Sequence, residues 1–157
     1  MNSPISSTLS DENRKVAADA LQNVLVDVID LSLIGKQAHW NVVGSQFRSI
    51  HLDLDELVAT AREFTDQVAE RLTAIGVSPD GRVATVARDS GTKGFGDGWS
   101  KDTEVVASIV GNLAAVIARL REGIEATGDA DPVTQDLLIG QAARLEQLHW
   151  MWQAQLA

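Results

Sequence analysis

The sequence predicts an all-α protein, a four-helix bundle in which one long crossover connects two helical hairpins. Four long stretches carry apolar residues at helical spacing. Only a few residues separate the first two stretches, and the same holds for the last two, which favours antiparallel neighbours. About 25 residues, Gly76 to Ser100, separate the two pairs, which is enough chain to cross the length of a bundle.

The first helix is predicted from about Asp11 to Trp40. Ser10 precedes it as an N-cap residue, and acidic residues occupy its first turn. Its apolar residues repeat at helical spacing at Leu21, Val24, Leu25, Val28 and Leu31. The second helix is predicted from about Phe47 to Ile75, closed by Gly76. Its apolar positions are Ile50, Leu54, Leu57, Val58, Ala61, Phe64, Val68 and Leu72.

The crossover carries six of the twelve glycines, and its segment RVATVARD predicts one short extra helix. The third long helix is predicted from about Lys101 to Ala126, with Ser100 as its cap and Gly128 after its end. The fourth begins at Asp131-Pro132, an N-cap followed by proline at the first helical position, and continues to the C-terminus. We expect a single domain over residues 1–157, with residues 1–10 as a short flexible tail.

Composition restricts the function. The 157 residues include 45% hydrophobic residues and no cysteine, and the formal net charge is −9. No run of apolar residues is long enough for a membrane span, and MNSPISSTLS lacks the features of an export signal. An acidic surface repels phosphate backbones and attracts cations. These features predict a cytoplasmic protein with no membrane span, no disulfide framework and no thiolate chemistry.

One face of the second helix carries metal-binding residue types. At about 100° per residue, Asp55, Asp66 and Glu70 lie about 40°, 60° and 100° round the axis from His51. Asp55 and Asp66 are eleven residues apart, or about 16 Å, whereas metal–ligand bonds are about 2.0 to 2.3 Å. The two ends of this stripe therefore cannot meet on one ion within a single helix.

An antiparallel pairing with a second copy removes this difficulty, because it places His51 and Asp55 of one chain against Asp66 and Glu70 of the other. His39, before the short turn, can join His51 at the same end. Mixed imidazole and carboxylate ligands suit Fe(II), and also Zn(II) or Mn(II). The alternative is that the histidines are packed, hydrogen-bonded side chains and the acids form a solvated helix face.

Residues 36–72, KQAHWNVVGSQFRSIHLDLDELVATAREFTDQVAERL, resemble the signature of the Dps family, the dodecameric miniferritins of the ferritin-like superfamily. The matching residues are Lys36, His39, Trp40, Asn41, Gly44, Phe47, His51, Asp55, Asp66, Ala69, Glu70 and Arg71. The order of the four helices extends this likeness over nearly the whole chain.

The resemblance implies a hollow homo-dodecamer with an iron-oxidising centre at each two-fold interface. His39, His51 and Asp55 would come from one subunit, and Asp66 and Glu70 from the other. Members of this family oxidise Fe(II), usually with hydrogen peroxide in preference to dioxygen, and store ferric mineral inside. Iron is then the metal, and no organic cofactor is expected.

Other residues have two interpretations each. Trp40 is either an oxidisable side chain that intercepts radical equivalents beside the iron or an interface packing residue. Asp131 and Asp136, near the start of the fourth helix, are candidates for an acidic pore that admits Fe(II), or for helix capping. Glu146 and His149 form a single Glu-x-x-His, whereas a di-iron site inside a bundle needs two, so we interpret this pair as packing.

Many Dps proteins also compact DNA, commonly through tails rich in Lys and Arg. The first thirteen residues contain neither, and the chain ends in QAQLA, so we do not expect DNA binding here. A nucleoid protein for which iron oxidation is secondary is the alternative function. A monomeric bundle with a structural metal is a third.

Overall fold

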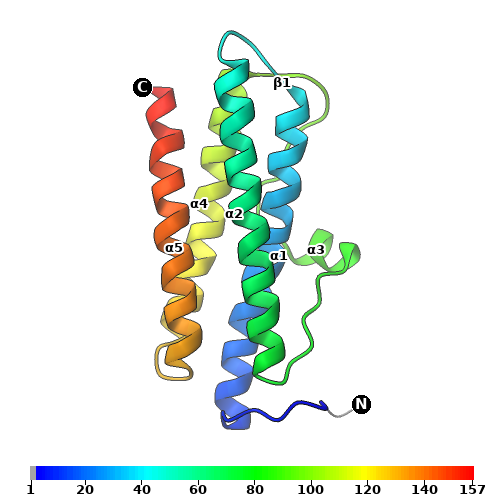
Figure 1. The fold of residues 1–157 in the computed structure, drawn as a ribbon, viewed down its shortest axis with the longest axis vertical. Coiled ribbons are helices and arrows are strands. Elements are labelled where there is room, and N and C mark those ends of the chain that lie inside the picture. Colours follow the sequence, from blue (N-terminus) through cyan, green and yellow to red (C-terminus); the bar gives the residue numbers. More distant parts are fainter. Residues whose placement is uncertain (1–2) are drawn as a thin grey trace.

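The computed structural model describes residues 3–157 and confirms the all-α, ferritin-like architecture (Figure 1). The four long helices are α1 (Asp11–Asn41), α2 (Phe47–Ala74), α4 (Asp102–Thr127) and α5 (Pro132–Gln153). The crossover carries the predicted short helix, α3 (Val83–Asp89), and a 3-10 turn (Ala154–Leu156) follows α5. Of the tail expected at residues 1–10, residues 1 and 2 lie outside the described residues, and Ser10 accepts the N–H of Asn13 as the N-cap of α1.

Ser100 does not cap α4, contrary to the sequence prediction. Ser100 and Lys101 form a short strand, β2, which pairs in parallel with β1 (Val42–Val43) between the first two helices. This pairing keeps the chain extended through Ser100, so α4 starts one residue later than predicted and Lys101 is its N-cap. The Lys101 N–H donates to Glu104 at 3.1 Å.

The apolar faces of the four helices meet in one continuous core. Its largest fully buried side chains include Leu21, Leu54, Leu113, Leu138 and Trp152, which come from all four helices. By length and composition alone, α4 is long and apolar enough to cross a membrane. Its buried face packs against α1 and α5, and the most apolar helix of a bundle core is expected to have this composition.

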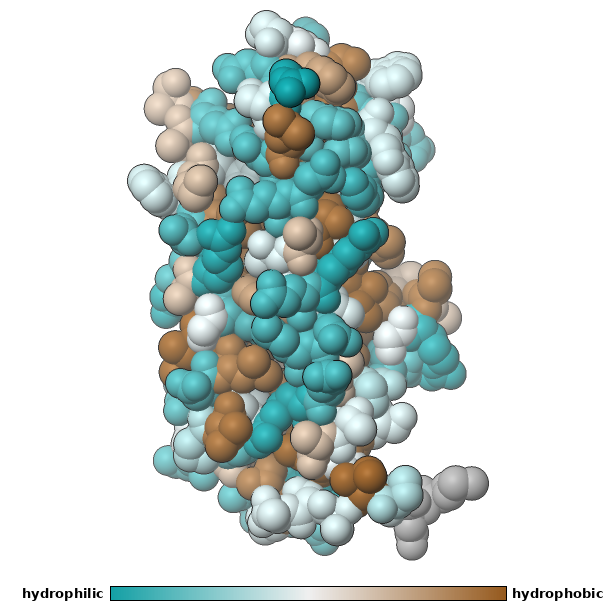
Figure 2. Space-filling view, in the orientation of Figure 1, coloured by the Kyte–Doolittle hydropathy of each residue, from teal (hydrophilic) through white to brown (hydrophobic). Residues whose placement is uncertain are grey.

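Polar side chains bridge α2 and α5 along their outer edge. Arg144 donates to Glu56, Gln141 to Gln67, and Arg71 to both Thr134 and Asp131. These contacts lie along α2 between Glu56 and Arg71. Hydrophilic residues accordingly cover much of the middle of this face, where α2 runs (Figure 2).

The glycine-rich crossover is tied to the bundle by a buried ion pair. Asp27, on α1, is fully buried, and its Oδ1 accepts from the Gly91 N–H at 2.7 Å and from Arg119 Nη1 at 2.8 Å. Burial raises the pKa of Asp27 above its ordinary value of 3.8, against the opposing effects of Gly91 and Arg119. Nearby, the Asn112 side chain accepts the Lys93 N–H and donates to the Gly94 carbonyl.

Replacing Arg119→Ala should lower the free energy of unfolding by about 3 kcal/mol, because it leaves a buried carboxylate without its cation. The control is Arg121→Ala, whose pair with Glu146 is largely exposed and should be worth less than about 1 kcal/mol. Urea denaturation of both variants at one fixed protein concentration measures the difference. Equal losses would contradict the assigned anchoring role.

The loss of stability in Arg119→Ala should also depend on pH. Without Arg119 the pKa of Asp27 in the folded state rises further. The folded state then binds a proton at pH values where Asp27 of the unfolded state, with its ordinary pKa of 3.8, is still ionised. The stability lost in Arg119→Ala should therefore be largest at about pH 8 and shrink as the pH falls toward about 5. A loss that grows on acidification would contradict the buried, unpaired state of Asp27.

Candidate metal centre

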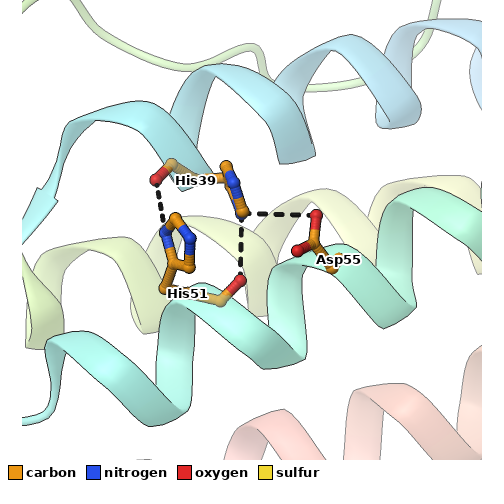
Figure 3. A group of neighbouring side chains, drawn as sticks. All are labelled: His39, His51 and Asp55. Carbon is orange, nitrogen blue, oxygen red and sulfur yellow. Dashed lines mark hydrogen bonds and ion pairs between the residues drawn. The ribbon is translucent and has the colours of Figure 1, made fainter.

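His39, His51 and Asp55 lie together where α1 ends and α2 begins (Figure 3). His39 is in the last turn of α1, and His51 and Asp55 are one turn apart on α2. Each residue offers one ligand atom, and these atoms all lie within 4.8 Å of one another. The structure thus brings together three of the five predicted ligands from a single chain.

Two crossed hydrogen bonds fix the imidazole rings. His39 Nδ1 lies 3.0 Å from the His51 carbonyl oxygen, and His51 Nδ1 lies 3.0 Å from the His39 carbonyl oxygen. A carbonyl can only accept, so each Nδ1 carries a proton, and Nε2 is the nitrogen that can offer a lone pair to a metal. The rings stack with their centroids 3.6 Å apart, and Phe47 packs against His51.

This arrangement is the one that metal-binding histidines usually have. A ligating imidazole commonly donates its other ring N–H to a carbonyl or carboxylate, which sets its tautomer and orientation. The His39 carbonyl is available because it lies in the last turn of α1, where the final carbonyls have no partner within the helix. The helix end therefore orients a ligand on the neighbouring helix.

Asp55 completes the cluster and is ionised. Its Oδ1 lies 2.5 Å from Lys36 Nζ and 3.4 Å from His39 Nδ1. The hydrogen bond from Lys36 holds the pKa of Asp55 below its ordinary value, with His39 and His51 contributing in the same direction. Lys36 was not predicted to act at the site, although its position three residues before His39 places both residues on one face of α1.

Asp66 and Glu70 are not part of this cluster. Both are exposed on α2, which runs from Phe47 to Ala74 without a break. A continuous helix keeps Asp55 and Asp66 about 16 Å apart along its axis. Their role as ligands, shared between subunits, therefore stays a prediction.

Trp40 follows His39 but points away from the core, with 65% of its surface exposed. This exposure is compatible with both interpretations of Trp40, redox partner and interface packing. The structure separates the two pore candidates more clearly, because only one of them is free to face solvent.

Asp131 is buried and bonded to Arg71 and Thr134. Burial opposes its ionisation, but these hydrogen bonds and the charge of Arg71 bring its pKa below the ordinary value. Asp136 is exposed, and so is Asp129. The geometry favours Asp136 over Asp131 for a surface that attracts cations.

Elsewhere on α5, Glu146 is bonded to Arg121, and it forms no candidate metal group with His149 among the described residues.

Comparisons with known proteins agree on one family. The model of the ferritin-like domain matches residues 18–157. The DNA protection during starvation protein of Mycolicibacterium smegmatis is 37% identical over 152 residues, which cover 94% of this chain and 81% of that protein. The structure of Dps from Microbacterium arborescens in the high iron form superposes with a TM-score of 0.91 at 33% identity, covering 96% of this chain and 99% of that one. The tetragonal form of Mycobacterium smegmatis Dps superposes with a TM-score of 0.93 at 35% identity, covering 99% of this chain and 94% of that one.

Co(II) binding by the metal-free protein should depend on the cluster. We expect His39→Ala and Asp55→Asn each to weaken Co(II) binding at least about 10-fold, as measured by titration calorimetry, because each removes or neutralises a ligand. His149→Ala is the matched control, since it removes the third histidine without touching the cluster, and it should leave the affinity unchanged. Equal losses in all three variants would exclude a specific site at His39, His51 and Asp55.

Proposed function

This chain belongs to the ferritin-like family as a Dps protein, and we propose that it is a ferroxidase that oxidises Fe(II) at centres shared between subunits and stores the ferric product in a hollow dodecamer. The family is known for iron storage and DNA protection, and its members generally oxidise iron. The cluster of His39, His51 and Asp55 supports this proposal, because it offers two imidazoles and a carboxylate with ligand atoms within 4.8 Å of one another, and each imidazole Nδ1 is bonded to a backbone carbonyl.

The three side chains have separate tasks in this mechanism. The Nε2 atoms of His39 and His51 bind Fe(II), and the Asp55 carboxylate adds a negative charge that favours the more highly charged Fe(III) product. Lys36 holds Asp55 in place until the iron arrives and is then displaced from Oδ1. Peroxide takes up one electron from each Fe(II) that is oxidised and is reduced to water with the uptake of protons, so iron and peroxide are removed together.

Asp66 and Glu70 of a second copy complete the centre. Three ligands from one chain leave coordination positions open, and exposed carboxylates one helical turn apart are suited to fill them. A two-fold, antiparallel contact between α2 helices brings these carboxylates to the histidines of the neighbour. Each contact then contains two equivalent centres, and the ferric product moves from them to acidic residues on the inner wall.

The charge distribution argues against the alternative, a nucleoid protein whose main task is to coat DNA. Within residues 3–157, nine of the thirteen Lys and Arg residues form ion pairs with acids of the same chain. The four that do not are Arg48, Arg62, Lys93 and Lys101. Few cations are therefore free to bind phosphates, and the net charge of −9 opposes contact with DNA. We accordingly propose a cytoplasmic iron-detoxifying protein.

A complementation experiment tests whether the centre is shared. Neither His51→Ala nor Asp66→Ala alone should oxidise Fe(II) with peroxide, as followed by ferric absorbance after anaerobic loading. When the two variants are unfolded, mixed in equal amounts and reassembled, a pair containing one of each has one intact centre and one that lacks both residues. With random pairing, about a quarter of the wild-type activity should return.

The double variant His51→Ala/Asp66→Ala mixed with wild type is the control for this experiment. Its mixed pairs contain no intact centre, so activity should fall to about a quarter although half of the chains are wild type. A mixture of single variants that stays inactive, together with a control at half the wild-type activity, would show that each chain holds its own site. A monomer in size-exclusion chromatography would favour the bundle with a structural metal.

DNA binding has its own test. A gel shift with metal-free protein at about 0.15 M salt should show no retardation of duplex DNA. Few Lys and Arg side chains lack an ion pair, and the negative net charge of the protein repels the phosphates. Strong retardation at this salt concentration would favour the nucleoid protein instead. Repeating the assay with Lys93→Glu/Lys101→Glu would then show whether these unpaired lysines contact the phosphates.

A further inference from the structure

The turn that carries the metal ligands is held by a residue from the other hairpin. Residues 42–46 connect α1 to α2, and residues 100–102 lead from the crossover into α4. The two segments are joined by the parallel pair of β1 with β2 and, directly after it, by the carboxylate of Asp102. We call residues 42–46 together with residues 100–102 the clasp.

The Asp102 carboxylate serves two helix starts. Its Oδ2 accepts the Gln46 N–H at 2.9 Å, and its Oδ1 accepts the Thr103 N–H at 2.9 Å. Gln46 is the N-cap position of α2 but supplies no capping bond of its own. A negative charge at this place is favourable at the positive ends of both α2 and α4. Asp102 is only 9% exposed, and the Gln46 N–H is the main reason why its pKa lies below the ordinary value.

Gly44 lets this carboxylate come close. Its φ is +136°, which side chains rarely adopt, and a Cβ built on it would overlap the Asp102 carboxyl group. The turn therefore combines a glycine that opens the space with an acid from another helix that fills it. Such complementarity indicates that the position of the turn is set by this contact.

The clasp lies directly beside the metal cluster in the chain. His39 precedes β1 by three residues, and His51 follows Gln46 by five. The crossed hydrogen bonds between the two histidines require that the end of α1 and the start of α2 keep their relative position within a few tenths of an ångström. Any shift of the turn changes both bonds together.

We propose that Asp102 is a positioning residue for the His39–His51 pair, which holds the turn in the place that keeps both imidazoles ready for metal. This inference rests on the proposed function of the pair as metal ligands. Asp102 touches neither ligand and acts through residues 42–46. It thereby makes the second hairpin, which supplies no ligand, a support of the centre.

Co(II) binding to the assembled, metal-free protein tests the proposal. Asp102→Ala should weaken Co(II) binding about 10-fold, which is typical when support of a ligand is lost, and Asp102→Asn should weaken it less, because the amide oxygen still accepts one N–H. Asp80→Ala is the matched control. Asp80 likewise accepts a backbone N–H at the start of a helix, that of Arg82, but lies beside Gln22, about 25 Å along α1 from His39. It should leave Co(II) affinity unchanged.

A second readout does not require any metal. In protein labelled with ¹⁵N-histidine, NMR should detect slowly exchanging Nδ1–H protons of His39 and His51, and Asp102→Ala should lose or broaden both signals while Asp80→Ala keeps them. If wild type showed these protons but bound no Co(II), the proposed function would fail while the positioning role could still be judged from the NMR spectra.

Gly44→Ala probes the contact from its other side, also where Asp102→Ala folds poorly. It should weaken Co(II) binding in the wild-type background, and the further loss should be smaller in the Asp102→Ala background, where the overlap is relieved. Unchanged Co(II) affinity and unchanged histidine signals in folded Asp102→Ala or Asp102→Asn would overturn the proposal. Equal losses from Asp80→Ala and Asp102→Ala, or strictly additive losses from Gly44→Ala and Asp102→Ala, would do the same.

Discussion

The unbroken course of α2 is the constraint on which the rest of the molecule depends. Its 28 residues contain no proline or glycine, so the helix holds its side chains at fixed distances along a rigid rod. One side of the rod fills the core, a second side bonds to α5, and a third carries the proposed metal ligands. Because the rod cannot bend, its acidic end is available to a neighbour and not to its own histidines.

The centre is also a product of how α1 ends. A helix terminus leaves carbonyl groups without partners, and here the His39 carbonyl accepts from the ring of His51. The reciprocal bond ties the ring of His39 to the backbone of α2. Backbone carbonyls thus set the tautomers of both histidine side chains, and one of these carbonyls is a group that the end of α1 leaves without a partner in the helix. Lys36 and Asp55 add opposite charges at the same place.

The sequence predicts the helices well because their apolar period and their end signals are local. Ser10 before α1 and Asp131-Pro132 before α5 mark real helix starts, and His51 and Asp55 share a face through their spacing alone. The pairing of Val42–Val43 with Ser100–Lys101 leaves no such mark, since strands of two residues have no period, and the predicted cap at Ser100 was wrong for this reason. The crossed histidine bonds and the burial of Asp27 against the crossover also depend on contacts distant in sequence. The roles predicted for Asp66 and Glu70 depend on a second copy of the chain, because a continuous α2 holds them far from the histidines of their own chain.

The polar edge between α2 and α5 has a consequence for how the bundle moves. Apolar side chains join each hairpin internally and join α1 to α4, whereas α2 and α5 are joined by polar side chains. Of these, Gln141, Asp131 and Thr134 are buried, and the pair Arg144–Glu56 is partly exposed. The partly exposed Arg144–Glu56 pair can exchange with solvent at little cost, so local opening should begin at this part of the edge and leave the α1–α4 packing intact. Amide protons of α5 near Arg144 would then exchange with solvent sooner than those of α1, and the part of the α2–α5 edge that opens first is the one that carries Glu56.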